Sequence, residues 1–145
     1  RNSQTSTISE QATISRRLGK KKALVADDDP HINKMVSKML SSDDWEVITA
    51  TTVDEAVEKI DQDVSIAFVD VHMPGPGPLE ALRLLNEKVP STRLVSFSGD
   101  YDQNLPEIVI RGGASEFLHK PVNRVDFIEQ ANRAIVDNEA LGMSN

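Results

Sequence analysis

Short apolar runs recur along the chain from Lys22 onward, and longer segments of mixed polarity separate them. The runs lie at residues 23–26, 47–50, 66–69, 94–97 and 117–118. Nearly uninterrupted apolar runs of this length are typical of strands that are buried on both faces, as in a parallel sheet. The pattern therefore predicts five strands.

The segments between these runs have helical periodicity. The clearest stripe spaces its apolar residues at i, i+3, i+4, i+7 and i+8, which places them on one helical face; it consists of Ile32, Met35, Val36, Met39 and Leu40. Four further helices are expected, around residues 53–60, 79–85, 105–109 and 127–135. The third helix along the chain is expected to stop before Pro90, and the fourth at Gly112 and Gly113.

Polar residues at the starts of three of these segments predict helix caps. Asp29 followed by Pro30 is a typical N-cap with proline at the first helical position. Thr52 and Glu55 have the spacing of a capping box, and Asn123 is the expected cap of the last helix.

Five strands that alternate with five helices predict the fold class. Parallel neighbours need right-handed helical crossovers, so this order gives an α/β, doubly wound, five-stranded parallel sheet with helices on both faces. We expect the folded domain to cover residues 21–138. Residues 1–20 are predicted to be a linker or disordered tail, because they are rich in Ser and Thr and poor in large apolar side chains, and residues 139–145 a C-terminal tail.

The charge distribution is strongly asymmetric. Residues 1–22 carry six basic side chains and one acidic one, a net charge of +5. Because the net charge of the whole chain is −7, the remaining residues carry −12. An acidic body of this kind repels a phosphate backbone, and we expect no direct nucleic-acid binding. It favours a cation or a basic partner.

Composition excludes several further classes of site. The chain has no cysteine, which excludes disulfides, zinc–thiolate sites and cysteine nucleophiles, and which fits a reducing compartment such as the cytoplasm. Its apolar runs are too short to span a membrane.

Polar residues follow four of the predicted strands at the point where each strand ends. They are Asp27, Asp28 and Asp29 after the first, Asp70 after the third, Ser98 after the fourth, and Lys120 with Pro121 after the fifth. The carboxyl ends of parallel strands share one edge of the sheet, where ligands bind, so we expect these residues to meet there.

Clustered carboxylates, a lysine and a hydroxyl together favour phosphoryl transfer. Carboxylates about 5 Å apart repel by roughly 3 kcal/mol per pair at an effective dielectric near 20, so they either take up protons or recruit a cation. Oxygen ligands favour a hard metal, which is Mg²⁺ first, with Mn²⁺ and Ca²⁺ as alternatives. The metal and the lysine would neutralise phosphoryl oxygens while a carboxylate attacks.

In this order and spacing, the motifs resemble the receiver domain of two-component response regulators. They are Asp27-Asp28, Phe68-Val69-Asp70-Val71-His72-Met73-Pro74-Gly75, Ser98-Gly99 and Lys120-Pro121, and the resemblance covers about residues 21–138. It implies a flavodoxin-like sheet with strand order 2-1-3-4-5. It also implies a cis peptide bond between Lys120 and Pro121.

The resemblance implies a role for each site residue. Asp70 is the phosphoacceptor, and Mg²⁺ is held by Asp28, Asp70, the backbone carbonyl of His72 and, through water, Asp27. Lys120 and Ser98 bind the phosphoryl group. Ser98 and Phe117 act as the switch. His72 and Asp100 tune the rate of dephosphorylation. The loop at residues 74–78 departs from the family pattern, because it is short and contains three prolines.

The resemblance also implies partners. The phosphoryl donor would be a histidine kinase or a histidine phosphotransfer protein, and phosphorylation and dephosphorylation would be self-catalysed, without a separate substrate. Two further partners are expected. One is another domain of a longer chain, and the other is a second copy bound through the surface of the fourth helix, the fifth strand and the fifth helix.

Simpler interpretations stay open for individual residues. Asp29 is best explained as a helix cap alone, Ser98 before Gly99 fits an ordinary turn, and Phe117 fits a static core ring. For the whole chain, the alternatives are a docking scaffold that is not phosphorylated and a Mg²⁺-dependent phosphohydrolase with an aspartate nucleophile. A flavin site is disfavoured by the three negative charges after the first strand.

Overall fold

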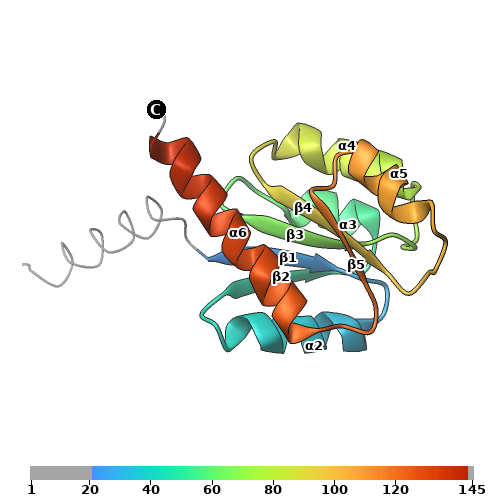
Figure 1. The fold of residues 1–145 in the computed structure, drawn as a ribbon, viewed down its shortest axis with the longest axis horizontal. Coiled ribbons are helices and arrows are strands. Elements are labelled where there is room, and N and C mark those ends of the chain that lie inside the picture. The colour runs from blue at the N-terminus through green and yellow to red at the C-terminus, as the bar shows by residue number, and fades with distance from the viewer. Residues whose placement is uncertain (1–20, 144–145) are drawn as a thin grey trace, which may run out of the picture.

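The computed structural model describes the backbone of residues 21–143 and the side chains of residues 21–136. Its core is one five-stranded parallel sheet with the strand order β2-β1-β3-β4-β5, as the resemblance implied. Figure 1 shows helices packed on both faces of this sheet. The predicted fold class and strand order are confirmed.

The strands match the apolar runs, with one or two polar residues added at their ends. They are β1 (Lys22–Ala26), β2 (Glu46–Ala50), β3 (Ile66–Asp70), β4 (Arg93–Ser98) and β5 (Glu116–His119). The inner strands β1, β3 and β4 are almost entirely buried, as predicted. The prediction of burial on both faces is wrong for the edge strands β2 and β5, because each has a neighbour on one side only.

The helices also follow the predicted order. They are α2 (Pro30–Ser41), α3 (Val53–Lys59), α4 (Pro78–Lys88), α5 (Leu105–Arg111) and α6 (Arg124–Met143). Helix α6 runs through the domain boundary expected at residue 138. The predicted tail at residues 1–20 lies outside the described residues. Within residues 21–143, no helix combines the length and the apolar character that crossing a membrane requires.

Each predicted N-cap makes a capping hydrogen bond. Asp29 accepts one from the amide of His31 at 2.9 Å, Thr52 accepts one from the amide of Glu55 at 3.1 Å, and Asn123 caps α6. The return bond of the capping box comes one residue earlier than the motif predicts, since Glu55 accepts from the amide of Thr51 at 2.6 Å.

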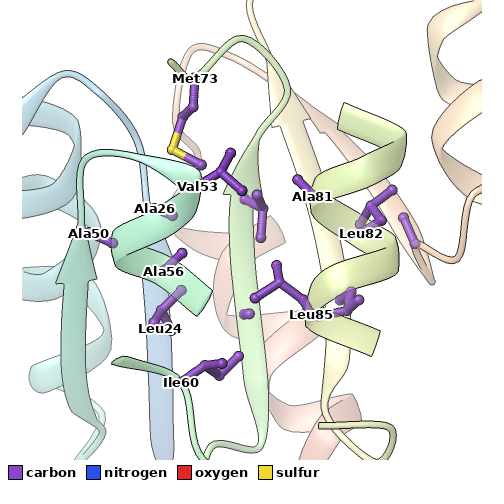
Figure 2. Close-up of a cluster of buried hydrophobic side chains, with 14 of the residues drawn as sticks. Leu24, Ala26, Ala50, Val53, Ala56, Ile60, Met73, Ala81, Leu82 and Leu85 are labelled. Carbon is purple, nitrogen blue, oxygen red and sulfur yellow. The ribbon is translucent and has the colours of Figure 1, made fainter. Parts of the chain in front are cut away.

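Two separate apolar cores lie on the two faces of the sheet. On one face, α3, α4 and α5 pack against the strands, and Figure 2 shows Leu24 beneath Ala56 of α3 and Leu85 on the inner side of α4. On the other face, α2 and α6 pack against the alternate strand residues. There Phe127 of α6 contacts the rings of Phe68 and Phe97 at centroid distances of 4.7 and 5.5 Å.

The buried face of α2 differs from the predicted stripe. Its buried residues are Asn33, Val36 and Leu40, whereas Met35 is 44% exposed. The helix is therefore rotated so that one polar residue, Asn33, faces the core. In α4 the stripe is shifted in the same way, because Leu79 is 48% exposed and Ala81 takes its place in the core.

Candidate functional site

The carboxyl edge of the sheet brings the predicted site residues together. Asp27 directly follows β1, Asp70 ends β3, Ser98 ends β4, and Lys120 follows β5. The strand register fixes their relative depth: Asp70 pairs with the residue before Ser98, and the amide of Lys120 donates to the carbonyl of Ser98 at 2.9 Å. Parallel pairing alone therefore assembles the site.

Three carboxylates form an acidic cluster at this edge. Asp27, Asp28 and Asp70 each place an oxygen within 4.8 Å of the other two. Asp27 is fully buried, Asp70 is 5% exposed, and Asp28 is exposed to solvent. The cluster therefore has a buried floor and one carboxylate at its rim.

Lys120 is the cation of this cluster. Its Nζ lies 2.8 Å from Asp27 Oδ2 and 3.7 Å from Asp70 Oδ1. It also lies 5.2 Å above the centre of the Phe97 ring, within the range of a cation–π contact. One ammonium group thus faces two buried carboxylates and an apolar floor.

The surroundings raise the pKa values of two site residues, Asp70 and Lys120. Burial and the neighbouring charge of Asp27 raise the pKa of Asp70, although Lys120 acts against them. Burial alone would lower the pKa of Lys120, but the hydrogen bond to Asp27 and the charge of Asp70 outweigh it and raise that pKa. Lys120 therefore stays charged at neutral pH.

The donor atoms of the cluster fit a hard divalent cation. Three carboxylates offer oxygen ligands, and with one lysine the cluster keeps a net negative charge that a divalent cation would neutralise. His72 follows closely, and its amide donates a long hydrogen bond of 3.5 Å to Asp70 Oδ1. The expected role of the His72 carbonyl as a ligand stays a prediction.

Two loops meet over the acidic cluster. Ser98 is fully buried, and its Oγ accepts a hydrogen bond of 3.0 Å from the amide of Asp100. The carboxylate of Asp100 lies 3.0 Å from His72 Nε2. This His72–Asp100 pair joins the loop after β3 to the loop after β4, a contact that spacing in the sequence could not reveal.

The predicted switch residue Phe117 lies beside two further rings. It is half-buried and meets His119 edge to face at 4.9 Å. His119 in turn stacks on Tyr101, which is 75% exposed, at 5.4 Å. The ring of Phe117 thus packs against the apolar core beneath α3, α4 and α5 and also belongs to a row of three rings.

The proline-rich loop takes a path that requires glycine at one position. Gly75 has a φ of +121°, and a Cβ there would come within 3.3 Å of Val53 Cβ. The amide of Val53 also bonds to the carbonyl of Pro74 at 3.4 Å, so the loop is fastened to the start of α3. After the fifth strand, the Lys120–Pro121 bond is cis, as the resemblance implied.

Comparison with known proteins agrees with this geometry. The family model of the response regulator receiver domain matches residues 23–132. The chain belongs to the response regulator receiver domain family. It is accordingly a phosphoacceptor signalling switch, which takes a phosphoryl group and changes its partner binding.

Individual relatives of this receiver domain differ in length. It is 30% identical over 115 residues to the chemotaxis protein CheY of Listeria monocytogenes, covering 78% of this chain and 97% of CheY. It is 29% identical over 100 residues to a cyclic di-GMP phosphodiesterase of Thermotoga maritima, but spans only 27% of that protein. A CheY-like receiver domain protein of Methanospirillum hungatei has a similar structure, with a TM-score of 0.76 and 25% identity, over 83% of this chain and 97% of that one.

The structure adds one residue that sequence reasoning missed. Asn33 is buried under the acidic cluster and bonds to the backbone of Asp27. The signal that could have found it is its position: Asn33 lies three residues before Val36 and seven before Leu40, on the core-facing stripe of α2.

Proposed function

We propose that Asp70 is the phosphoacceptor of this receiver domain, and that the donor is a histidine kinase or a histidine phosphotransfer protein. The observation that carries this proposal is the difference between the two buried carboxylates. Both oxygens of Asp27 are held by contacts of 2.8 Å, to the amide of Asp29 and to Lys120 Nζ. The contacts of Asp70 are longer, at 3.5 and 3.7 Å, which leaves its carboxylate available for attack.

In the proposed reaction, a carboxylate oxygen of Asp70 forms a bond to phosphorus while the phosphorus–nitrogen bond of the donor breaks. The donor imidazole leaves and takes up a proton from solvent. Lys120, whose pKa is raised, stays charged and neutralises the phosphoryl oxygens. Asp28, Asp70, the His72 carbonyl and, through water, Asp27 would hold Mg²⁺, which supplies further neutralising charge when it is bound.

The switch that we propose starts at Ser98. Its Oγ lies at the end of β4 beside the site and accepts a hydrogen bond from the amide of Asp100. Turning this hydroxyl toward a phosphoryl group would break that bond and release the start of the loop that carries Tyr101. Phe117 would then move inward, which would separate it from His119 and change the surface around α5, β5 and α6.

The His72–Asp100 pair supports the proposed role of both residues in the lifetime of the phosphoryl group. It connects the two loops that flank Asp70. We propose that the water molecule that attacks the acyl phosphate enters between these loops. An intact pair therefore slows hydrolysis, and a broken pair speeds it.

The test is the intact mass of the protein after incubation with acetyl phosphate, in Mg²⁺ and then in EDTA. We expect one hydroxylamine-labile phosphoryl group on the wild type in Mg²⁺ only, and none on Asp70→Asn. Since no kinase is present, this result would also support self-catalysed phosphorylation. Asp63→Asn is a matched control, because it removes one carboxylate at an exposed turn before β3, at the opposite edge of the sheet from the cluster.

Either of two outcomes would contradict the proposal. An adduct of equal amount on Asp70→Asn would place the phosphoryl group elsewhere. No adduct on the wild type, with Mg²⁺ in excess, would favour the docking scaffold that is not phosphorylated.

Further partners and a compartment are proposed from the relatives and from the composition. Relatives that are several times longer support a place for this receiver domain beside other domains of one chain. A second copy as a partner is supported by a solved receiver domain dimer of 27% identity, and the surface that we propose for it is formed by α5, β5 and α6. The compartment that we propose is the cytoplasm, in line with the absence of cysteine from the sequence.

A further inference from the structure

Among the described residues, the only side-chain hydrogen bond to the backbone of Asp27 comes from Asn33 of α2. Its Nδ2 donates to the carbonyl of Asp27 at 2.9 Å and to the carbonyl of Ala50 at 3.0 Å. Asn33 is 4% exposed, so water does not replace these bonds. The opposite orientation of the amide would place Oδ1 against two carbonyl oxygens, so the two acceptors fix it.

These bonds complete the set of contacts that immobilise Asp27. Its amide bonds to the carbonyl of Ala50 at 3.1 Å, its Oδ1 accepts from the amide of Asp29 at 2.8 Å, and its Oδ2 lies 2.8 Å from Lys120 Nζ. With the Asn33 bond to its carbonyl, three of the four polar groups of Asp27 are hydrogen-bonded, and the fourth, Oδ2, has the ion-pair contact with Lys120. The end of β1 is thereby tied to the end of β2 and to α2.

The consequence reaches the neighbouring residue Asp28. The carbonyl of Asp27 and the amide of Asp28 belong to one planar peptide unit. Because Asn33 fixes that carbonyl, it fixes the direction in which the chain leaves toward Asp28. Asp28 is exposed at the rim of the cluster, and its side chain makes no hydrogen bond or ion pair within residues 21–136, so its backbone sets its position.

Asparagine at position 33 carries a stability cost that an apolar core residue would not have. Asn33 Oδ1 is buried and has no hydrogen-bond partner in the part of the chain that the structure describes. An apolar side chain of similar size would remove that unsatisfied oxygen, but it would also remove both donors. What asparagine provides at this position, and leucine does not, is therefore the pair of N–H donors.

We propose that Asn33 is a positioning residue for the divalent cation site, acting through the Asp27 carbonyl on the orientation of Asp28. This inference rests on the proposed function, since it assumes that the cluster binds Mg²⁺. Loss of a group that orients a metal ligand typically weakens metal affinity about 10- to 100-fold. We expect a loss in the lower half of this range, because Asn33 acts through the backbone.

The test compares Asn33→Leu with Thr92→Val in the full chain. Thr92 is a matched control, because it is also buried and its Oγ1 also donates to a backbone carbonyl, that of Val64 at 2.7 Å. It lies just before β4, at the opposite edge of the sheet. Each variant is titrated with Mg²⁺ by calorimetry and, separately, with Mn²⁺ by electron paramagnetic resonance; urea unfolding without metal gives its stability.

We expect Asn33→Leu to bind both cations about tenfold more weakly than the wild type, and Thr92→Val to bind them within twofold, even where the two lose similar stability. If Asn33→Leu does not fold, Asn33→Ser, which keeps a shorter donor, takes its place and should still lose affinity. Wild-type affinity in a folded Asn33 variant would overturn the positioning role alone. A wild type that binds neither cation would overturn the proposed metal site, and with it this inference.

Discussion

Asp70 should destabilise the metal-free fold, so replacing it with asparagine should stabilise the protein at neutral pH. Asp70→Asn keeps the shape of the side chain and removes one negative charge from a cluster in which Asp27 and Asp28 lie within 4.8 Å. The variant thus separates the cost of the charge from the packing of the side chain.

The magnitude follows from the distances. At an effective dielectric of 20, charges 4.8 Å apart repel by about 3.5 kcal/mol, and Lys120 at 3.7 Å attracts by about 4.5 kcal/mol. The repulsion from Asp27 and Asp28, less the attraction of Lys120, leaves a net cost of about 2.5 kcal/mol for the charge of Asp70. Asp28 is exposed and its repulsion is screened, while the burial of Asp70 adds to the cost, so we expect a gain of about 2 kcal/mol in Asp70→Asn.

The gain should depend on pH with a definite sign. The pKa of Asp70 is raised in the folded state, so its charge costs stability at pH values above that raised pKa. As the pH falls through it, Asp70 takes up a proton and becomes as neutral as asparagine. The advantage of Asp70→Asn should therefore be largest near neutral pH and shrink as the solution becomes acidic.

Urea unfolding in EDTA, followed by the fluorescence of Trp45, measures this gain. Trp45 is the single tryptophan and lies buried in the core between α2 and the sheet. With a typical slope, about 2 kcal/mol moves the midpoint by on the order of 1 M urea. Asp63→Asn, which changes the net charge equally at an exposed turn, should move it little. Two results would contradict a stability cost of the Asp70 charge. One is an Asp70→Asn variant no more stable than the wild type at neutral pH, and the other is a gain that is the same at every pH.

Three further variants test other parts of the site. Lys120→Met leaves the buried charge of Asp27 without its partner and should cost about 3 kcal/mol or more in urea unfolding; a loss below about 1 kcal/mol would contradict the pairing. Asp100→Asn breaks the exposed pair between the two loops and should leave the midpoint of urea unfolding almost unchanged. It should also shorten the lifetime of the phosphoryl adduct in a mass time course, and an unchanged lifetime would argue against the tuning role. Gly75→Ala should lose about 1–2 kcal/mol, because its φ is +121°, whereas Gly77→Ala, whose added methyl group meets nothing within 4 Å, should be close to neutral; equal losses would refute the strain argument.

The convergence of Asp28, Asp70 and Lys120 could be predicted because it depends on topology alone. Apolar runs identify the strands, alternation with helices makes the strands parallel, and parallel strands end at one edge. Residues 42 and 50 positions apart in sequence are thereby adjacent in space. No side-chain detail is needed for this step.

The arrangement within the site depends on details that periodicity does not carry. Asn33 faces the core because α2 is rotated away from its most apolar stripe, and only the backbone acceptors at the strand ends explain that rotation. His72 and Asp100 were both expected near the site, but their contact depends on the path of two loops. Loop paths follow from local turn geometry, which single residues do not specify.

The course of α6 has a practical consequence for experiments on this protein. Figure 1 shows the helix crossing the sheet diagonally and ending beyond the starts of the strands, away from the arrowheads where Asp70 lies. A helix of 20 residues is about 30 Å long. A surface tether or a fluorescent label placed at the C-terminal end of α6 would therefore leave the acidic edge open, so binding of a donor protein can be measured on an immobilised receiver domain without the attachment blocking its approach.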